Sequence, residues 1–252
     1  MDKMTKLTFI EVCAGAGGLS YGFISEGFEP LLLNDNNKYC CKTLLKNHPN
    51  VNVVLDSMIN LDLKEYCDKV DVLLGGVPCQ SFSLAGNQKG LEDKRGDLIL
   101  KFKSIIDTVK PKVFLIENVA GLKMHNKGKT LDKIISYLNS SDLYKIKYKV
   151  LNSLNYGVPQ KRKRLIIVGT LKSFSLKEYH FPEHSKKDIE QLTIRNALKN
   201  VPSSQGFQYS HYKQQIFKLI PPGGGWIDLP IEIQKEYLGN SFEKTGGKRG
   251  IA

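Results

Sequence analysis

Short apolar segments alternate with longer segments of mixed polarity along the first two thirds of the chain. The apolar segments have the length of β-strands, and the segments between them have the length of helices. The expected strands are 7–12, 31–33, 51–55, 70–74, 113–116 and 165–168. The expected helices are 18–27, 37–47, 61–68, 96–109 and 130–139. This order predicts an α/β fold of βαβ units with a doubly wound, mostly parallel sheet.

The pattern changes after Thr170, where proline, glycine and glutamine become more frequent. Only two modest helices are expected there, at 191–199 and 211–220. The change predicts a first domain over residues 1–170 and a smaller region over residues 171–252.

The chain is basic, with 37 Lys and Arg against 25 Asp and Glu, a formal charge of +12 and a pI near 9.3. Such a charge favours a polyanionic partner such as nucleic acid, although it can also serve solubility alone. No apolar run reaches the roughly 18 residues of a membrane span, and the first residues show no signal-peptide pattern. We therefore expect a cytoplasmic protein.

The five cysteines show no C-x-x-C spacing, which argues against a disulfide framework and against a structural zinc site. His180 and His184 have helical spacing, but Pro182 lies between them and no cysteine pair precedes them. We therefore expect no metal site.

The segment Gly75–Ser83 places one cysteine behind a proline, directly after the apolar strand 70–74. Its two glycines break the strand, so Cys79 is expected in a rigid turn at the strand's carboxyl end, where open α/β sheets carry their chemistry. Cys79 is therefore a candidate nucleophile. The alternative is a small buried hydrophobic residue, as many free cysteines are.

The first expected strand runs into a glycine-rich turn at residues 13–19, which opens a helix. Glycines there let a ligand approach the backbone and the amide groups of the helix N-terminus. Ser20 stands where the dinucleotide pattern G-x-G-x-x-G has its third glycine. Asp35 follows the second strand and could accept hydrogen bonds from a ribose, and Asp56 could accept one from an adenine. Together they predict a cofactor that contains adenosine but no pyrophosphate.

A carboxyl group and a pair of arginines follow later in the chain. Glu117 directly follows the expected strand 113–116, so it should emerge at the same sheet edge as Cys79 and could act as an acid. Strand alternation places Arg162 and Arg164 on one face and the lysines beside them on the other. The alternatives are a capping or salt-bridged glutamate and a solvated basic edge strand.

A glycine-rich first turn is followed, in this order, by the segment around Cys79, by Glu117-Asn-Val119 and by Gln160-x-Arg162-x-Arg164. This combination resembles the DNA cytosine-5 methyltransferase family. Residues 86–96 are similar to the family's mobile active-site loop, and the likeness spans residues 7–170 almost continuously. The resemblance implies a Rossmann-like S-adenosylmethionine-dependent methyltransferase fold, followed by the start of a region that reads a target in double-stranded DNA.

The resemblance also implies a mechanism. The thiolate of Cys79 would add to carbon 6 of a flipped cytosine, and carbon 5 would then take a methyl group from S-adenosylmethionine. Glu117 would bind ring nitrogen 3 and the amino group, Arg164 the ring oxygen, and Arg162 would support Cys79. A specific DNA target within a restriction-modification system is the implied setting.

The residues that the resemblance assigns to the S-adenosylmethionine site lie in the first turn, after the second and third strands, and on both sides of the active-site loop. They are Cys13, Gly15, Ala16, Gly18, Asp35, Asn36, Asp56, Ser57, Pro78 and Leu98. Cys13 stands where the family more often has phenylalanine, so the adenine would lose an aromatic neighbour.

The family's late motifs have no counterpart in residues 171–252. This predicts that the polypeptide alone is nearly inactive and that a second polypeptide carries the missing part, with an inactive truncated fragment as the alternative. A tRNA cytosine-5 methyltransferase of the same family is a further alternative, because the core motifs do not separate the substrates. A dinucleotide-dependent oxidoreductase should show the third glycine, and a non-catalytic nucleic-acid-binding protein needs neither Cys79 nor Glu117.

Overall fold

The structure is a computed structural model that describes residues 6–78, 97–174, 178–184, 192–203, 206 and 208–239. The chain divides into two compact units, Met1–Lys199 and Asn200–Ala252. The division of functions at residue 170 stays a prediction.

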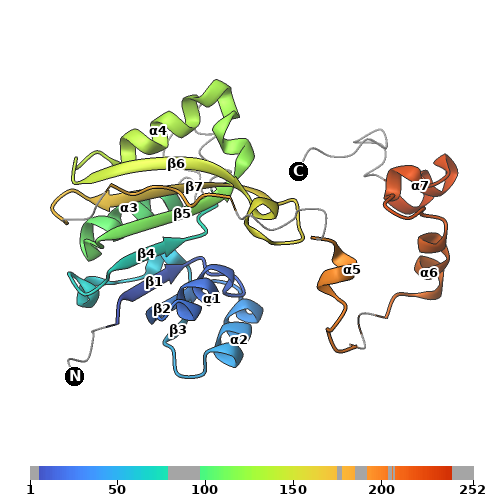
Figure 1. Cartoon of the computed structure of the whole chain (residues 1–252), viewed down its shortest axis with the longest axis horizontal. Helices are drawn as coiled ribbons and strands as arrows, with labels where there is room; N and C mark the ends of the chain where they lie inside the picture. The colour runs from blue at the N-terminus through green and yellow to red at the C-terminus, as the bar shows by residue number, and fades with distance from the viewer. Residues whose placement is uncertain are drawn as a thin grey trace. The chain divides into compact units, whose positions relative to one another are not determined.

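A seven-stranded sheet forms the centre of the first unit, in the order β3-β2-β1-β4-β5-β7-β6 (Figure 1). The strands are β1 (Thr8–Val12), β2 (Glu29–Asp35), β3 (Val53–Leu55), β4 (Val72–Gly75), β5 (Val113–Val119), β6 (Tyr144–Asn152) and β7 (Lys163–Leu171). Strands β1 to β5 pair in parallel, whereas β7 runs antiparallel to both β5 and β6. The predicted α/β class with a mostly parallel sheet is confirmed.

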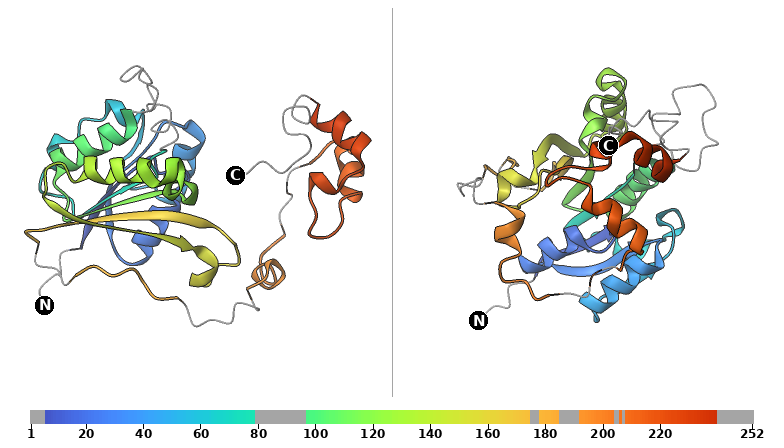
Figure 2. Two further views of the ribbon diagram at one scale, coloured as in Figure 1. Left: turned by 90° about the horizontal axis from the view of Figure 1, so that it is seen from above. Right: turned by 90° about the vertical axis from the view of Figure 1, so that its right-hand side faces the viewer.

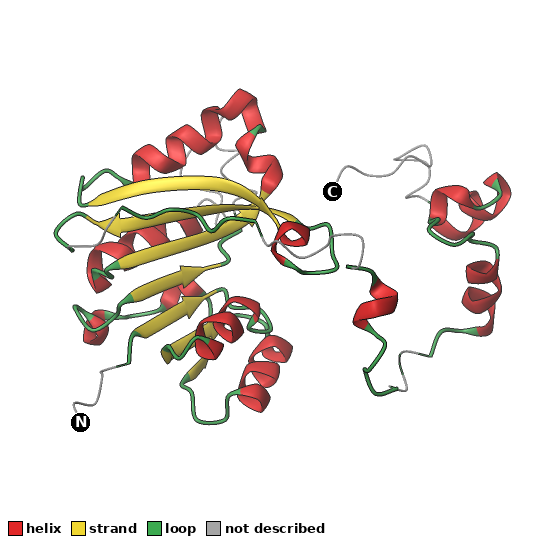
Figure 3. Cartoon of the chain, in the orientation of Figure 1, coloured by secondary structure: helices red, strands yellow, loops and turns green. Residues whose placement is uncertain are grey.

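Helices cover both faces of this sheet (Figure 3). They are α1 (Gly18–Ser25), α2 (Lys38–Asn47), α3 (Asp97–Val109) and α4 (Lys129–Leu138). Leu44 of α2 packs in one core with Phe9, while Phe102 of α3 and Ile134 of α4 share the other core with Ile10. Because neighbouring strand residues point to opposite faces, β1 contributes to both cores. Helices α3 and α4 lie side by side on their face (Figure 2).

Two elements of the first unit differ from the expected pattern. The helix expected at 61–68 is wrong, since only a single 3₁₀ turn forms there, at Lys64–Tyr66. The Asp62 carboxylate accepts the backbone N–H of Lys64 at 3.2 Å, a local turn that competes with a longer helix. Strand β6 was not expected, because lysine occurs at every second position of its first half and lysine is uncommon in strands. An edge strand tolerates these lysines.

The expected helices 191–199 and 211–220 correspond to α5 (Ile194–Ala197) and α6 (His211–Lys218). A third helix, α7 (Ile231–Leu238), was not expected. In the second unit Trp226 stacks on Tyr237 of α7, with ring centroids 4.5 Å apart. Among the described residues, no helix combines the length and the apolar character needed to cross a membrane.

Gly169 of β7 provides a test of how Phe114 of β5, its partner in the neighbouring strand, packs in the core. A Cβ at this position would overlap the ring of Phe114, which is fully buried. We expect Gly169→Ala to destabilise the protein by about 1–3 kcal/mol, because overpacking forces a shift in the core. Urea unfolding measures the change. Gly22→Ala is the control, since its added methyl group would meet no atom within 4 Å and should be neutral or stabilising. Equal stabilities of the two variants would contradict the packing described here.

Candidate active site

Glu117, Arg162 and Arg164 form a charged cluster where β5 ends and β7 begins. Arg164 Nε lies 2.7 Å from Glu117 Oε1, and Arg162 Nη2 lies 3.8 Å from the same oxygen. The antiparallel register pairs Glu117 with Ile166 and Val119 with Arg164. Because Arg164 lies two residues from Ile166, its side chain lies on the same face of the sheet as that of Glu117. The side chains of Glu117 and Arg164 are 26% and 27% exposed, so the cluster is accessible from solvent.

A cavity of about 200 Å³ lies beside this cluster. Its lining combines the turn after β4, the end of β5 and the two arginines. The lining residues are Gly76, Val77, Pro78, Glu117, Asn118, Val119, Arg162 and Arg164. The cavity is smaller than the roughly 300–1,000 Å³ of sites for drug-sized ligands.

The predicted nucleophile Cys79 and the predicted active-site loop lie outside the described residues. Pro78, the residue before Cys79 in the chain, lines the cavity with Glu117. The turn after β4 and the carboxyl end of β5 therefore meet at one site, as the parallel pairing of Gly75 with Ile116 requires.

The glycine-rich turn after β1 is tied to the end of β2 by Asp35. Asp35 Oδ2 accepts the backbone N–H of Gly15 at 2.8 Å, and Oδ1 accepts that of Asn37 at 2.8 Å. The turn passes through the left-handed region at Gly15 and Gly17, which glycine adopts without steric cost. Asp35 thus holds the turn in place through backbone contacts that the sequence pattern did not indicate.

Cys13 begins this turn and also has a left-handed backbone, with φ at 54°. Burial, together with the nearby charges of Asp35 and Glu11, raises the pKa of its thiol to about 11. A thiol with this pKa stays protonated near neutral pH, which disfavours a nucleophilic role, and the place of Cys13 in the cofactor site stays a prediction.

Asp56 and Ser57 follow β3 at the same sheet edge. Asp56 Oδ1 accepts the backbone N–H of Ser57 at 2.6 Å and the side-chain amide of Asn60 at 2.8 Å. The buried Asn34 of β2 donates to the carbonyl oxygens of Val54 and Asp56, at 3.1 and 2.8 Å. Asn34 therefore fixes the backbone that carries Asp56.

The other residues assigned to the cofactor lie around the same edge. Ala16 and Asn36 are exposed in the turns after β1 and β2, and Gly18 is the first residue of α1. Leu98 lies in the first turn of α3 and packs against the core that contains Cys13. Whether these side chains contact a cofactor stays a prediction.

Glu11 of β1 was not predicted to be a functional residue, although it is the one charged residue in this strand. It is 1% exposed, and its Oε2 accepts the backbone N–H of Ser20 in α1 at 2.9 Å. Desolvation by burial raises the pKa of Glu11 from 4.5 to about 7, although hydrogen bonds from Ser20 oppose the shift.

This raised pKa makes stability depend on pH. The folded state keeps the Glu11 proton to higher pH than the unfolded state, so the stabilisation is present below pH 4.5 and is lost as pH rises to about 7. We expect wild type to lose about 3 kcal/mol relative to Glu11→Gln across this window. Urea unfolding at several pH values measures the difference. The exposed Glu26→Gln serves as the control, and parallel stability curves for wild type and Glu11→Gln would contradict the prediction.

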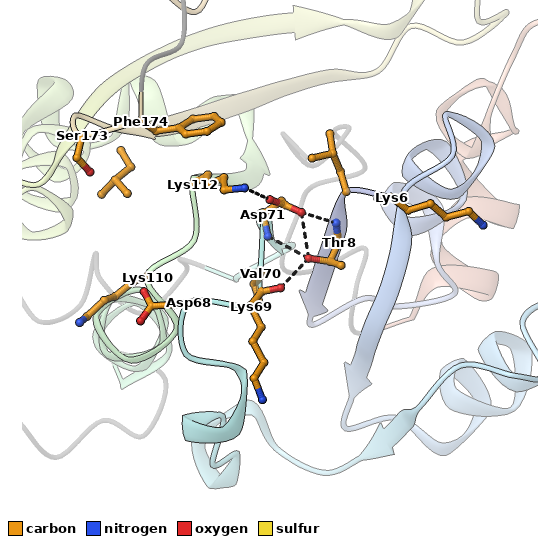
Figure 4. A pocket seen from close by; sticks show the side chains of 12 residues that line it. Lys6, Thr8, Asp68, Lys69, Val70, Asp71, Lys110, Lys112, Ser173 and Phe174 are labelled. Carbon is orange, nitrogen blue, oxygen red and sulfur yellow. Dashed lines mark hydrogen bonds and ion pairs between the residues drawn. The ribbon is translucent and has the colours of Figure 1, made fainter. Parts of the chain in front are cut away.

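A second cavity of about 430 Å³ lies at the opposite, amino edge of the sheet. Figure 4 shows Lys112 directed at Asp71, which it approaches to 2.6 Å, while the Lys69 and Lys110 side chains extend away from one another. None of the predicted site residues that the structure describes lines it. Within the described ranges, no group of three or more His, Cys, Asp or Glu residues could hold a metal ion.

Residues 7–227 match the model of the C-5 cytosine-specific DNA methylase family. The chain belongs to this family. Its curated relatives include Type II methyltransferase M.PspPI of Psychrobacter sp. (strain TA137), which is 44% identical over 259 residues. Another is Type II methyltransferase M.Eco47II of Escherichia coli, which is 42% identical over 253 residues. The resemblance seen in the motifs is therefore confirmed at the level of the family.

These matches cover 100% and 97% of this chain but only 62% and 60% of the two relatives. The chain thus spans about three fifths of their length. Among solved structures of the methylase fold, a mutant of Spodoptera frugiperda DNMT2 superposes with a TM-score of 0.66 at 19% identity. That match covers 86% of this chain and 66% of the DNMT2 chain, and it shows the shared fold alone.

Proposed function

We propose that the protein transfers a methyl group from S-adenosylmethionine to carbon 5 of cytosine in a specific sequence of double-stranded DNA. The observation that carries this proposal is the cluster of Glu117, Arg162 and Arg164 beside Pro78, in a chain of the methylase family. The names of the relatives, which are Type II methyltransferases, support a restriction-modification setting.

The residues around the first turn fit S-adenosylmethionine. A Cβ at Gly15 or Gly18 would meet no atom within 4 Å, so the space beside the turn is open. Each oxygen of Asp35 accepts one backbone amide and can accept a second hydrogen bond from a ribose hydroxyl. Asp56 Oδ2 accepts no hydrogen bond from a described residue, which leaves it for an adenine amino group. The bound cofactor would supply the electrophilic methyl group.

The proposed chemistry begins at Cys79. Carbon 5 of cytosine is too weak a nucleophile to take a methyl group unaided, so the Cys79 thiolate forms a bond to carbon 6 and moves electron density onto carbon 5. Carbon 6 lies inside the base stack, so the cytosine must be flipped out of the duplex. After methylation the carbon-5 proton leaves, the bond to sulfur breaks, and the thiolate is restored.

Glu117 and Arg164 act on the opposite edge of the ring in this proposal. Glu117 hydrogen-bonds ring nitrogen 3 and the amino group, where charge changes as the thiolate adds. Arg164 holds Glu117 through Nε and donates Nη1 to the carbonyl of Lys163 at 2.9 Å. Its Nη2 is not used by either contact and can reach the ring oxygen. Arg162 is 50% exposed and supports the thiol and the base.

Trapping tests the proposal directly. Duplex DNA containing 5-fluorocytosine should form a covalent adduct, because fluorine on carbon 5 cannot leave as a proton. The adduct should require S-adenosylmethionine and should be absent in Cys79→Ser. An adduct with tRNA but not with duplex DNA would favour the tRNA methyltransferase instead. An adduct with neither, in the presence of a chain that carries the family's late motifs, would refute both.

The second polypeptide stays a prediction, as does the cytoplasmic location. We expect that adding candidate chains with the family's late motifs raises methyl transfer by this protein. The control omits the added chain. No gain with any such chain would count against a divided enzyme.

A further inference from the structure

A side-chain hydrogen bond from the neighbouring strand reaches the turn between β4 and Cys79. The side-chain amide of Asn118, in β5, donates to the carbonyl oxygen of Val77 at 2.7 Å. Asn118 is 6% exposed and Val77 is 1% exposed, so this hydrogen bond is shielded from water. A bond made in such surroundings is stronger than one at the surface, so its loss costs more.

The backbone ladder ends just before this point. The last pair between β4 and β5 joins Gly75 to Ile116, and from Glu117 onward β5 pairs with β7 on its other side. The paired residues of the two strands therefore end before Gly76 and Val77. The Asn118 side chain adds a contact beyond the last pair.

The orientation of this amide is defined by both of its ends. Asn118 Oδ1 accepts the backbone N–H of Val119 at 2.9 Å, while Nδ2 faces the Val77 carbonyl. A flipped amide would place oxygen against oxygen and nitrogen against an N–H group, so only one orientation satisfies both contacts.

Packing restrains the same turn on its other sides. A Cβ at Gly75 would lie 2.5 Å from the ring of Phe102, and a Cβ at Gly76 would lie 3.1 Å from the carbonyl oxygen of Cys13. These contacts limit how close the turn can come to its neighbours. The hydrogen bond from Asn118 adds a directional restraint relative to β5.

We propose that Asn118 is a positioning residue, which sets the place of the turn that carries Cys79 relative to Glu117. Asn118 follows Glu117 directly, and Val77 lies two residues before Cys79. The two groups proposed to act on opposite edges of one cytosine ring are therefore linked through a buried hydrogen bond. This inference rests on the proposed function.

The test uses Asn118→Asp, which places an oxygen opposite the Val77 carbonyl, and Asn118→Ala, which removes the donor without adding a charge. Asn47→Asp, an exposed change at the end of α2, is the matched control. Hydrogen exchange should become faster in the segment 72–78 of both Asn118 variants and stay unchanged in the control. Unchanged exchange in that segment would overturn the inference without any measurement of activity.

The second readout separates positioning from stability. We expect the rate of adduct formation with 5-fluorocytosine DNA to fall by about 10²-fold in both variants, because misplacing a reacting group by about 1 Å has this effect. The dissociation constants for DNA and for S-adenosylmethionine should stay unchanged. An adduct rate equal to wild type in a variant with faster exchange would also overturn the inference. Failure of wild type to form any adduct would refute the proposed function instead, and the exchange measurement would still decide the contact.

Discussion

Replacing Cys79 with serine is expected to lower methyl transfer to DNA by about 10⁴-fold or more, because loss of the nucleophile closes the covalent route. A serine hydroxyl is hardly ionised at neutral pH, so it cannot replace a thiolate in the attack on carbon 6. Transfer of labelled methyl groups to duplex DNA measures the rate, and a denaturing gel detects the adduct.

The matched control for this variant is Cys67→Ser. Cys67 lies before β4, where its thiol contacts Asp68 at 3.3 Å, and it lines neither cavity. This control should retain the wild-type rate. Binding of DNA by Cys79→Ser should also be retained, because the thiol contributes to bond formation rather than to affinity. A Cys79→Ser protein with a rate within tenfold of wild type would refute the covalent mechanism.

Glu117→Gln is expected to lower the rate of methyl transfer by about 10²–10³-fold, the effect of removing one group that stabilises developing charge. The amide keeps the size of the carboxylate but loses the charge that Arg164 Nε approaches to 2.7 Å. Hydrogen bonding to the base should be weakened, and Arg164 should be held less firmly in its orientation. Single-turnover kinetics at saturating DNA isolates this effect from changes in binding.

Glu178→Gln is the control for Glu117→Gln. Glu178 is also a glutamate paired with a basic side chain, Lys147, but it is 64% exposed and does not line the cavity. Its loss should leave the rate unchanged, since exposed ion pairs contribute little. Equal rates for Glu117→Gln and wild type would remove the carboxylate from the mechanism while leaving the role of Cys79 open.

The sequence alone determined the class of the fold and the motifs that led to its family. Strand and helix periods depend on near neighbours in the chain, so β1, β2, β4, β5 and β7 could be located from their apolar segments. The same period of two predicted that Arg162 and Arg164 share a face, and both approach Glu117. The sequence pattern did not predict β6, because its many lysines do not form the apolar segment by which the other strands were located.

Only the tertiary structure decided how the side chains at the sheet edge are used. Asp35 accepts amides from the turn beside it, Asn118 bonds to Val77 across 41 residues of chain, and Glu11 is buried enough to hold a proton near neutral pH. Each of these contacts depends on the register between strands that are distant in sequence, and packing of the two cores sets that register. Residue type and spacing along the chain do not determine this register. The catalytic residues could therefore be predicted from the motifs, whereas the contacts that hold them in place could not.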